Sequence, residues 1–333
     1  MKIRFSALVF VILSVFLSAC VSAENNSSNT SLIESTISVG SVQSSSETDI
    51  SSAEESSQSS SSIVTTSSKT TESKAETSEN ALMVGNYKIF DANNSRGLDT
   101  KKYGYSFGVA KDGIVNSQSV KNQEKFDSLE GVNALVYDKN PTEKCMYLTF
   151  DNGYEYKNYT ADILDTLKQK NVKAAFFVTL DYVKKNHNLV RRMIDEGHIV
   201  GNHSAKHKSF PTISRKEMAT EIYLLEDYLI KNFGYESKYF RFPSGEHSHC
   251  SLELVSSMGY RSIFWSLAYA DWDTSKQPTK ESAIETVTSR YHNGAVILLH
   301  AVSRANTEGL SEMIDIAHSE GYTFKTLDEY YNK

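Results

Sequence analysis

Cysteine, proline and long apolar runs are scarce in this chain of 333 residues, which has only three cysteines and four prolines. So few cysteines exclude a disulfide-dense scaffold, and we expect Cys145 and Cys250 to be unpaired, buried thiols. The apolar run at residues 7–17 is shorter than the roughly 20 residues that a membrane-spanning helix needs. The sequence therefore predicts a protein that folds around an ordinary hydrophobic core.

The first twenty residues have the pattern of a secretory signal peptide. Lys2 and Arg4 precede the apolar run, and small residues precede Cys20. Leu17-Ser18-Ala19-Cys20 resembles the lipobox of bacterial lipoproteins. This resemblance implies cleavage before Cys20, a lipid on its thiol, and an anchor at the outer face of the cytoplasmic membrane, facing the cell wall. The alternative is an ordinary secretory signal that happens to contain a cysteine.

Residues 21–80 contain no Phe, Trp or Tyr, and half of them are serine or threonine. Such a segment cannot bury enough apolar surface to offset the entropy of ordering it. We predict a disordered linker with a root-mean-square span of roughly 40–50 Å.

The linker also explains the net charge of −6. Residues 1–20 carry +2 and residues 21–80 carry −7, which leaves −1 for residues 81–333. A nearly neutral domain lacks the broad basic field that nucleic acid binding requires, so we expect no nucleic acid partner.

From residue 145 to residue 333 short β-like runs alternate with helical patterns. This alternation predicts an α/β domain with a parallel sheet. About 185 residues is short for an eight-stranded barrel, so an open or seven-stranded barrel fits better. Residues 81–144 are expected to form a lead-in segment packed on the barrel. The predicted strands are 146–150, 174–178, 199–202, 239–242, 262–265, 295–299 and 322–324, and the predicted helices are 161–170, 189–196, 215–232, 252–258, 281–290 and 310–319.

Several predicted strands run directly into polar residues. In parallel α/β folds reactive groups lie just past the carboxyl ends of the strands, so these side chains should meet at one rim. His203 and His207 also stand four residues apart, a spacing that puts two imidazoles within reach of one metal if the segment forms a helical turn. The strand-end groups are Asp151-Asn152-Gly153, His203 to His207, Arg241 to Gly245, Asp271-Trp272 and His300.

These five groups, in this order, resemble the motifs of polysaccharide deacetylases, carbohydrate esterase family 4. The resemblance covers roughly residues 145–330 and implies a distorted seven-stranded (β/α) barrel. The sequences Asp151-Asn152-Gly153-Tyr154-Glu155, 197–203 and 264–272 are most similar to peptidoglycan N-acetylmuramic acid de-N-acetylases, whose products lead to muramic δ-lactam. The upstream run 104–108 is similar to that branch too. The implied activity is hydrolysis of N-acetyl groups from peptidoglycan or a related N-acetylated glycan, by a monomer.

The resemblance also implies a role for each residue. His203 and His207 would bind a divalent metal, Zn²⁺, that activates water. Asp151 would be the general base, held ionised by Arg241. His300 would protonate the leaving amine, with Asp271 keeping its imidazole charged. The expected substrate-binding residues are Pro243, Ser244 with its backbone N–H at the oxyanion, Trp272, Leu298 and Tyr154.

One residue departs from the family pattern. The second carboxylate of the usual Asp-Asp-Gly motif, a metal ligand, is Asn152 here. A neutral amide oxygen is a weaker ligand, so we expect lower metal affinity. A metal that does bind keeps more net positive charge and can acidify its water further.

Two other functions remain open at this stage. A non-catalytic wall-binding lipoprotein would explain Asn152, and an O-acetyl esterase acting on another polysaccharide would use the same fold. His247, His249 and Cys250 also form a dense group, but they lack a metal-site signature, and we expect no second metal site there.

Overall fold

The computed structural model describes residues 81–333. The predicted signal peptide, the predicted linker and the lipidation site at Cys20 lie outside the described residues. Within 81–333, no helix combines the length and the apolar character that a membrane crossing would require.

Eight strands form one sheet in which all strand pairs are parallel. Seven of them follow the order β10-β4-β5-β6-β7-β8-β3, and β9 also pairs with β4. Two isolated bridges, Tyr137 to Ala295 and Leu267 to Ile297, join the β3–β8 side to β9 and curl the sheet toward closure. The strands of this sheet are β3 (Ala134–Leu135), β4 (Cys145–Asn152), β5 (Ala175–Val178), β6 (Ile199–Asn202), β7 (Tyr239–Phe240), β8 (Arg261–Ile263), β9 (Ala295–His300) and β10 (Thr323–Phe324).

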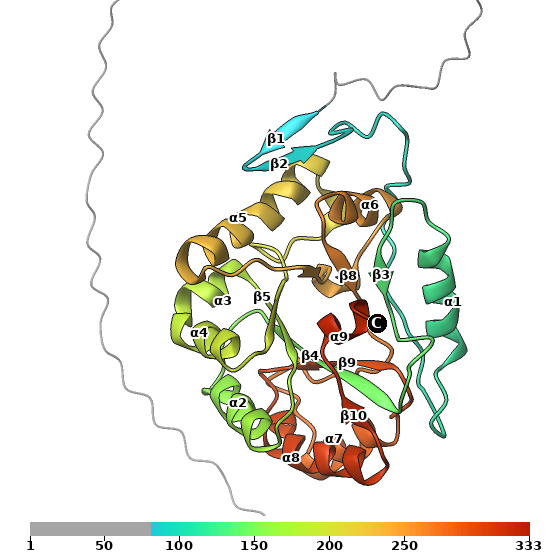
Figure 1. Ribbon diagram of the computed structural model, residues 1–333, viewed down its shortest axis with the longest axis vertical. Helices are drawn as coiled ribbons and strands as arrows, with labels where there is room; N and C mark the ends of the chain where they lie inside the picture. The colour runs from blue at the N-terminus through green and yellow to red at the C-terminus, as the bar shows by residue number, and fades with distance from the viewer. Residues whose placement is uncertain (1–80) are drawn as a thin grey trace, which may run out of the picture. The chain divides into compact units, whose positions relative to one another are not determined.

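Helices surround the sheet in Figure 1, which confirms the predicted α/β class and the distorted (β/α) barrel. Seven of its strands, β4 to β10, lie within residues 145–333 as predicted, and β3 is an eighth. The helix α5 is the longest, and a capping box between Ser214 and Glu217 begins it. It ends at Gly234, which has the left-handed conformation of a helix C-cap. The helices are α1 (Ser117–Asp127), α2 (Tyr159–Gln169), α3 (Leu180–Lys185), α4 (His187–Asp195), α5 (Arg215–Phe233), α6 (His249–Ser257), α7 (Lys280–Thr288), α8 (Arg304–Ser319) and α9 (Leu327–Tyr331).

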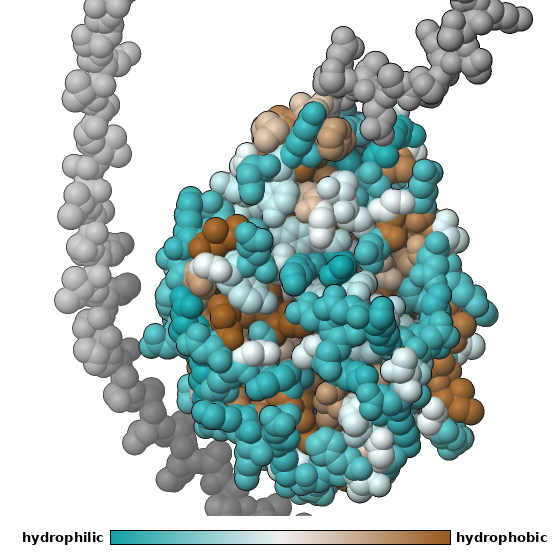
Figure 2. Space-filling model, viewed as in Figure 1, coloured by the Kyte–Doolittle hydropathy of each residue, from teal (hydrophilic) through white to brown (hydrophobic). Residues whose placement is uncertain are grey.

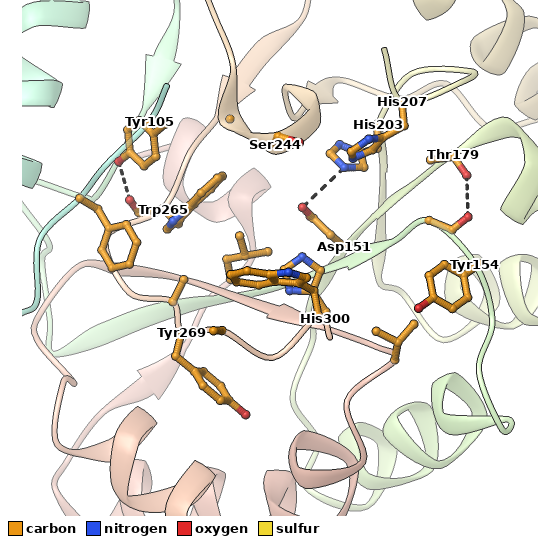
Figure 3. Close-up of a pocket in the computed structure, with 18 of the residues that line it drawn as sticks. Tyr105, Asp151, Tyr154, Thr179, His203, His207, Ser244, Trp265, Tyr269 and His300 are labelled. Carbon is orange, nitrogen blue, oxygen red and sulfur yellow. Dashed lines mark hydrogen bonds and ion pairs between the residues drawn. The ribbon is translucent and has the colours of Figure 1, made fainter. Parts of the chain in front are cut away.

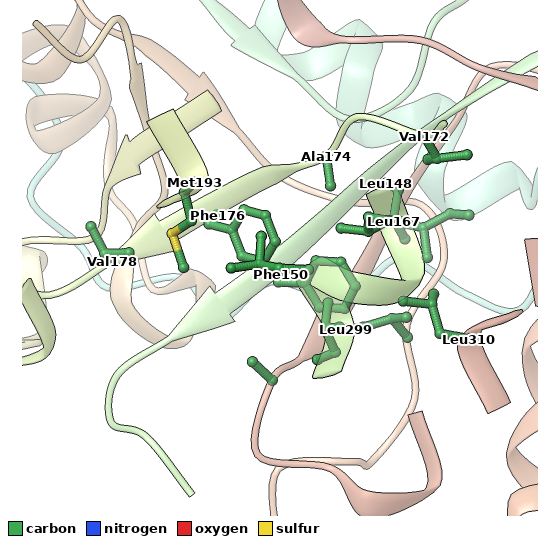
Figure 4. Close-up of a cluster of buried hydrophobic side chains, with 14 of the residues drawn as sticks. Leu148, Phe150, Leu167, Val172, Ala174, Phe176, Val178, Met193, Leu299 and Leu310 are labelled. Carbon is green, nitrogen blue, oxygen red and sulfur yellow. The ribbon is translucent and has the colours of Figure 1, made fainter. Parts of the chain in front are cut away.

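The pleat of the strands divides the core into two layers. On β4, Met146, Leu148 and Phe150 pack outward against the helices, in the cluster shown in Figure 4. Cys145 and Tyr147 point into the barrel, where a separate cluster also contains Phe177 of β5. Because successive side chains alternate between faces, Thr149 and Asp151 continue the inward row. The barrel interior is therefore filled with apolar side chains at one end and polar ones at the other.

The segment 81–144 packs on the barrel and contributes to it. The strands β1 (Leu82–Val84) and β2 (Tyr87–Ile89) form an antiparallel hairpin that contacts α5. The strand β3 belongs to the main sheet, where Ala134 pairs with Ser262 and Leu135 with Ile263. The sheet therefore begins before residue 145, at a strand of two residues that is too short to be recognised in the sequence.

Three helices were not predicted, α1, α3 and α9. Leu327 of α9 packs into the barrel-interior cluster, with Tyr330 and Tyr331 beside it, and so closes the end of the barrel opposite Asp151. The face of the molecule seen in Figure 2 is mostly hydrophilic, with apolar residues in small separate patches. Cys145 and Cys250 are both buried and unpaired, as predicted.

Candidate active site

A cavity of about 1180 Å³ opens at the carboxyl ends of the strands. Asp151, His203, His207 and His300 all line it, so residues 149 positions apart in the chain share one pocket. Figure 3 shows the carboxylate of Asp151 pointing toward the two neighbouring imidazoles, with His300 on the other side. The predicted gathering of strand-end groups at one rim is therefore what the structure shows.

Asp151 rests on a buried arginine. Arg241 Nη1 donates to Asp151 Oδ1 at 2.8 Å, and Arg241 Nη2 donates to the hydroxyl of Thr149 at 2.9 Å. Burial by itself would raise the pKa of Asp151, but neighbouring positive charge, above all that of Arg241, outweighs it and holds the pKa below its ordinary value. The carboxylate is thus ionised, with Oδ2 left free to face the cavity.

The tautomer of His203 follows from its contacts. Its Nδ1 lies 2.8 Å from the backbone carbonyl of Arg241, which can only accept, so the proton is on Nδ1. Its Nε2 therefore presents a lone pair, 3.6 Å from Asp151 Oδ2. Burial lowers the pKa of His203 to about 4, which keeps the ring neutral at pH 7. A neutral imidazole with its other nitrogen held by a carbonyl has the arrangement typical of metal ligands.

His207 lies beside His203, with ring centroids 4.8 Å apart, but not because of a helical turn. The segment between them is a loop in which Ser204 and His207 have positive φ angles. Glu221 of α5 anchors this loop, since its carbonyl accepts from Ala205 N and its carboxylate from Lys206 N. The prediction that one helical turn brings the two imidazoles together was wrong, although their proximity was predicted correctly.

Asn152 is fully buried and is not part of the cavity wall. Its Nδ2 donates to Thr160 Oγ1 at 3.2 Å, and its Oδ1 has no hydrogen-bond partner among the described residues. In residues 81–333 no cluster of three His, Cys, Asp or Glu side chains is arranged to hold a metal. The donors in the cavity wall that fit a divalent cation are therefore the two imidazoles, while the amide oxygen of Asn152 is unsatisfied but lies outside the wall.

His300 ends β9 and is held by a fully buried carboxylate. Asp271 Oδ1 lies 2.7 Å from His300 Nδ1, and Asp271 Oδ2 accepts from the His300 backbone N–H at 2.7 Å. Asn306 of α8 donates to the same Oδ2 at 2.6 Å. Burial works to lower the pKa of His300, but the charge and hydrogen bond of Asp271 outweigh it and raise the pKa. The imidazole therefore stays protonated at a higher pH than a free histidine, with Nε2 the nitrogen that Asp271 leaves free.

The predicted substrate-binding residues occupy different positions. Leu298 is a buried part of the wall, whereas Trp272 and Tyr154 are 58% and 53% exposed at the rim. Ser244 is also exposed in the wall, with a φ of 55° that is uncommon for a residue other than glycine. Pro243 is buried at the start of that turn and does not line the cavity.

Several residues of the site were not predicted individually. The hydroxyl of Thr149 accepts from Arg241, and the amide of Asn306 donates to Asp271. Tyr105 from the lead-in segment forms part of the cavity wall. Tyr105 can approach because residue 245 is glycine, where a Cβ would come within 2.8 Å of Tyr105 Cβ. For Thr149 a signal existed, because strand alternation places it on the same face as Asp151. For Asn306 the sequence offered none.

The dense group of His247, His249 and Cys250 has three separate environments. His247 is buried against Phe264, and its Nδ1 bonds to the carbonyl of Gly245. His249 lies near the carbonyl of Glu130, at 3.4 Å. Cys250 is buried next to the guanidinium of Arg215.

Comparison with known proteins gives one consistent result. A family model described as polysaccharide deacetylase matches residues 138–263. The peptidoglycan-N-acetylmuramic acid deacetylase PdaA of Bacillus subtilis is 39% identical over 216 residues, which are 65% of this chain and 82% of that protein. A peptidoglycan-N-acetylglucosamine deacetylase of Bacillus cereus is 31% identical over 55% of this chain and 67% of its own. The solved structure of Bacillus subtilis PdaA, a family 4 carbohydrate esterase, superposes with a TM-score of 0.64 at 34% identity, over 70% of this chain and 99% of that one.

Proposed function

The chain belongs to the polysaccharide deacetylase family, and we propose that it hydrolyses N-acetyl groups of peptidoglycan amino sugars and releases acetate. N-acetylmuramic acid is the sugar we favour, because the muramic acid deacetylase among the relatives is the more similar of the two. The observation that carries the proposal is that one cavity contains both an ionised carboxylate and a protonated imidazole. Asp151 is held by Arg241, and His300 is held by Asp271.

Asp151 is the general base. Its Oδ2 faces the cavity and takes the proton of the attacking water, while Arg241 holds Oδ1 and prevents the carboxylate from turning away. The water oxygen bonds to the acetamide carbon, and the carbonyl oxygen becomes an oxyanion. The backbone N–H of Ser244 stabilises that charge.

His300 is the general acid. Its Nδ1 is tied to Asp271, so the proton on its Nε2 passes to the amine nitrogen as the carbon–nitrogen bond breaks. Acetate and a free amino sugar result. Asp151 has gained one proton and His300 has lost one, so the protons of the step balance. Leu298 walls the acetyl group, and Trp272 and Tyr154 bound the sugar at the rim.

His203, His207 and the amide oxygen of Asn152 would hold a divalent metal, Zn²⁺, which when bound polarises the acetamide carbonyl and acidifies the attacking water. The neutral imidazoles and the unsatisfied Oδ1 support this assignment. The amide in place of a carboxylate weakens the site.

The protein would work outside the cell as a monomer. The basic start, apolar run and Cys20 at residues 1–20 support lipid anchoring to the outer face of the cytoplasmic membrane. The Ser/Thr-rich residues 21–80 would then connect the anchor to the enzyme as a flexible linker, within reach of the wall.

Mass spectrometry of digested peptidoglycan tests the activity. Full-length protein with Zn²⁺ should remove acetyl from amino nitrogen, and fragmentation should place the loss on muramic acid. Loss of O-acetyl alone would indicate an esterase. Unchanged masses, together with glycan binding that survives both Asp151→Ala and His300→Ala, would indicate a non-catalytic wall-binding protein.

A further inference from the structure

Arg290 is a cation in the cavity wall that the reaction above does not use. It follows α7 in the chain, and its Nη1 donates to the carbonyl of Ala268 at 2.9 Å. In the part of the chain that the structure describes, this is the only hydrogen bond of its side chain, and the guanidinium forms no salt bridge. The rest of its guanidinium fork is thus available to an anion entering the cavity.

The other charges of the cavity differ from Arg290. Arg241 lies behind the cavity wall, fully buried and paired with Asp151, and His300 in the wall is paired with Asp271. Lys206 and Asp181 are exposed in the wall. Only Arg290 combines partial burial with an unpaired charge among these five groups, and a partly desolvated guanidinium binds a carboxylate more strongly than an exposed ammonium does.

The position of Arg290 fits a substituent next to the acetamide. Its acceptor Ala268 lies three residues before Asp271, the partner of His300, and Tyr269 also connects to that system, because its hydroxyl bonds to Asn306 at 2.5 Å. In muramic acid the lactyl ether sits on the ring carbon beside the one that carries the acetamide. Glucosamine has a hydroxyl there and no carboxylate.

We propose that Arg290 is a specificity-determining residue that binds the lactyl carboxylate of muramic acid. This proposal rests on the proposed deacetylase function and assigns its preference between the two amino sugars. Tyr105, Trp265 and Tyr269 line the same cavity, and they supply the aromatic surface against which a sugar ring can lie (Figure 3). The carboxylate would accept from the guanidinium while the acetamide lies between Asp151 and His300.

The test compares three glycans with full-length protein: strands with a free lactyl carboxylate, the same strands with that carboxylate converted to the methylamide, and chitooligosaccharides. Arg290→Gln should lower kcat/KM on the free-carboxylate strands by roughly 10- to 100-fold, mainly through KM, because one charge-assisted contact is lost. Rates on the other two glycans should change less than about two-fold. Arg290→Lys should recover part of the loss, since it restores the charge without the fork.

Arg304→Gln is the matched control, because it removes an exposed arginine that pairs with Glu308 and does not line the cavity. It should leave all three rates unchanged. An equal loss on all three glycans in Arg290→Gln would mean that Arg290 only supports the wall, and no loss on any would mean that it does not meet the substrate. Either result would overturn the proposal while leaving the deacetylase function intact. If the wild-type protein releases no acetate from any of the glycans, the proposed function itself fails.

Discussion

Asp151 and Asp271 are both buried carboxylates at the same end of the barrel, but they have different partners. Asp151 is paired with an arginine through one oxygen and leaves the other facing the cavity. Asp271 is fully buried and has both oxygens occupied, by His300 and Asn306. The arginine stays charged at every accessible pH, so its partner can serve as a base. His300 carries a proton that it can release, so its partner Asp271 only holds the imidazole in place and keeps it charged.

The largest effect should follow Asp151→Asn. An amide cannot take the proton of the attacking water, so kcat should fall roughly 10²- to 10⁴-fold in a steady-state acetate assay. The same change leaves Arg241 buried without a counter-ion and should cost about 3–5 kcal/mol in urea unfolding. Asp181→Asn is the control, because it removes an exposed carboxylate from the same cavity wall. If Asp151→Asn keeps more than a tenth of the activity, Asp151 is not the base.

Asp271→Asn should have a smaller, pH-dependent effect. Asp271 raises the pKa of His300, and the acid form is the active one, so activity is lost as pH rises through that pKa. Without the carboxylate the pKa falls, and the alkaline limb of the kcat profile should move to lower pH, with a loss of roughly 10- to 100-fold at pH 8.

The pair of Asp271 and His300 should also make the stability of the fold depend on pH. A raised histidine pKa stabilises the fold below the ordinary value of 6.5, and this contribution disappears as pH rises through the raised pKa. Asp271→Asn should therefore destabilise the protein more at pH 6 than at pH 9, measured by urea unfolding. Asp273→Asn removes a partly exposed carboxylate that bonds to Ser275 and not to His300, and it should shift neither the rate profile nor the stability. An alkaline limb that stays in place in Asp271→Asn would show that His300 is not the acid.

Asn152→Asp should sharpen the comparison by adding a third buried carboxylate, next in the chain to Asp151. Without metal, this buried charge has no partner and should lower Tm. The Asn152→Asp protein should bind Zn²⁺ roughly ten-fold more tightly than the wild type does, measured by isothermal titration calorimetry, and its Zn²⁺-dependent rise in Tm should be larger. Asn171→Asp, an exposed change outside the cavity, should behave as wild type. Equal Zn²⁺ affinity in Asn152→Asp and wild type would remove residue 152 from the proposed ligand set.

Trp272→Ala should have the smallest effect. The ring is mostly exposed, 6.0 Å from that of His300, so its loss should raise KM a few-fold without changing stability. Ile114→Ala, an equally exposed apolar side chain that does not line the cavity, should leave KM unchanged. A fall in kcat with constant KM in Trp272→Ala would instead place the ring against the reacting atoms.

The sequence predicted the fold well where hydrophobic periodicity was strong. The strand 199–202 was predicted with its observed bounds, and α5 to within one residue, because Ser214 and Gly234 mark its ends. The strands β1, β2 and β3 and the helices α3 and α9 were missed, since elements of two to six residues carry too little periodicity. Their formation depends on packing against the barrel. The helix α1 was missed because Val120 and Phe126 are the only apolar residues among its eleven.

The candidate site was predicted only in part for a similar reason. Strand ends predicted that Asp151, His203 and His300 would converge, because parallel strands place their carboxyl ends at one edge. The loop between His203 and His207 depends on Glu221, and Asp271 depends on Asn306, and both partners are distant in the chain. Contacts of that kind leave no local pattern, and the burial of Pro243 could not be predicted either. The direction of Asn152 could be, because strand alternation turns it away from the inward face that carries Asp151.

The most direct test of this account is to count acetate and new free amino groups together on de-O-acetylated peptidoglycan strands, with full-length protein and Zn²⁺. We predict equal amounts of the two products from wild-type protein and almost none from Asp151→Asn at the same folded concentration. Acetate without matching amines, or no acetate from folded wild-type protein with any divalent metal, would contradict it.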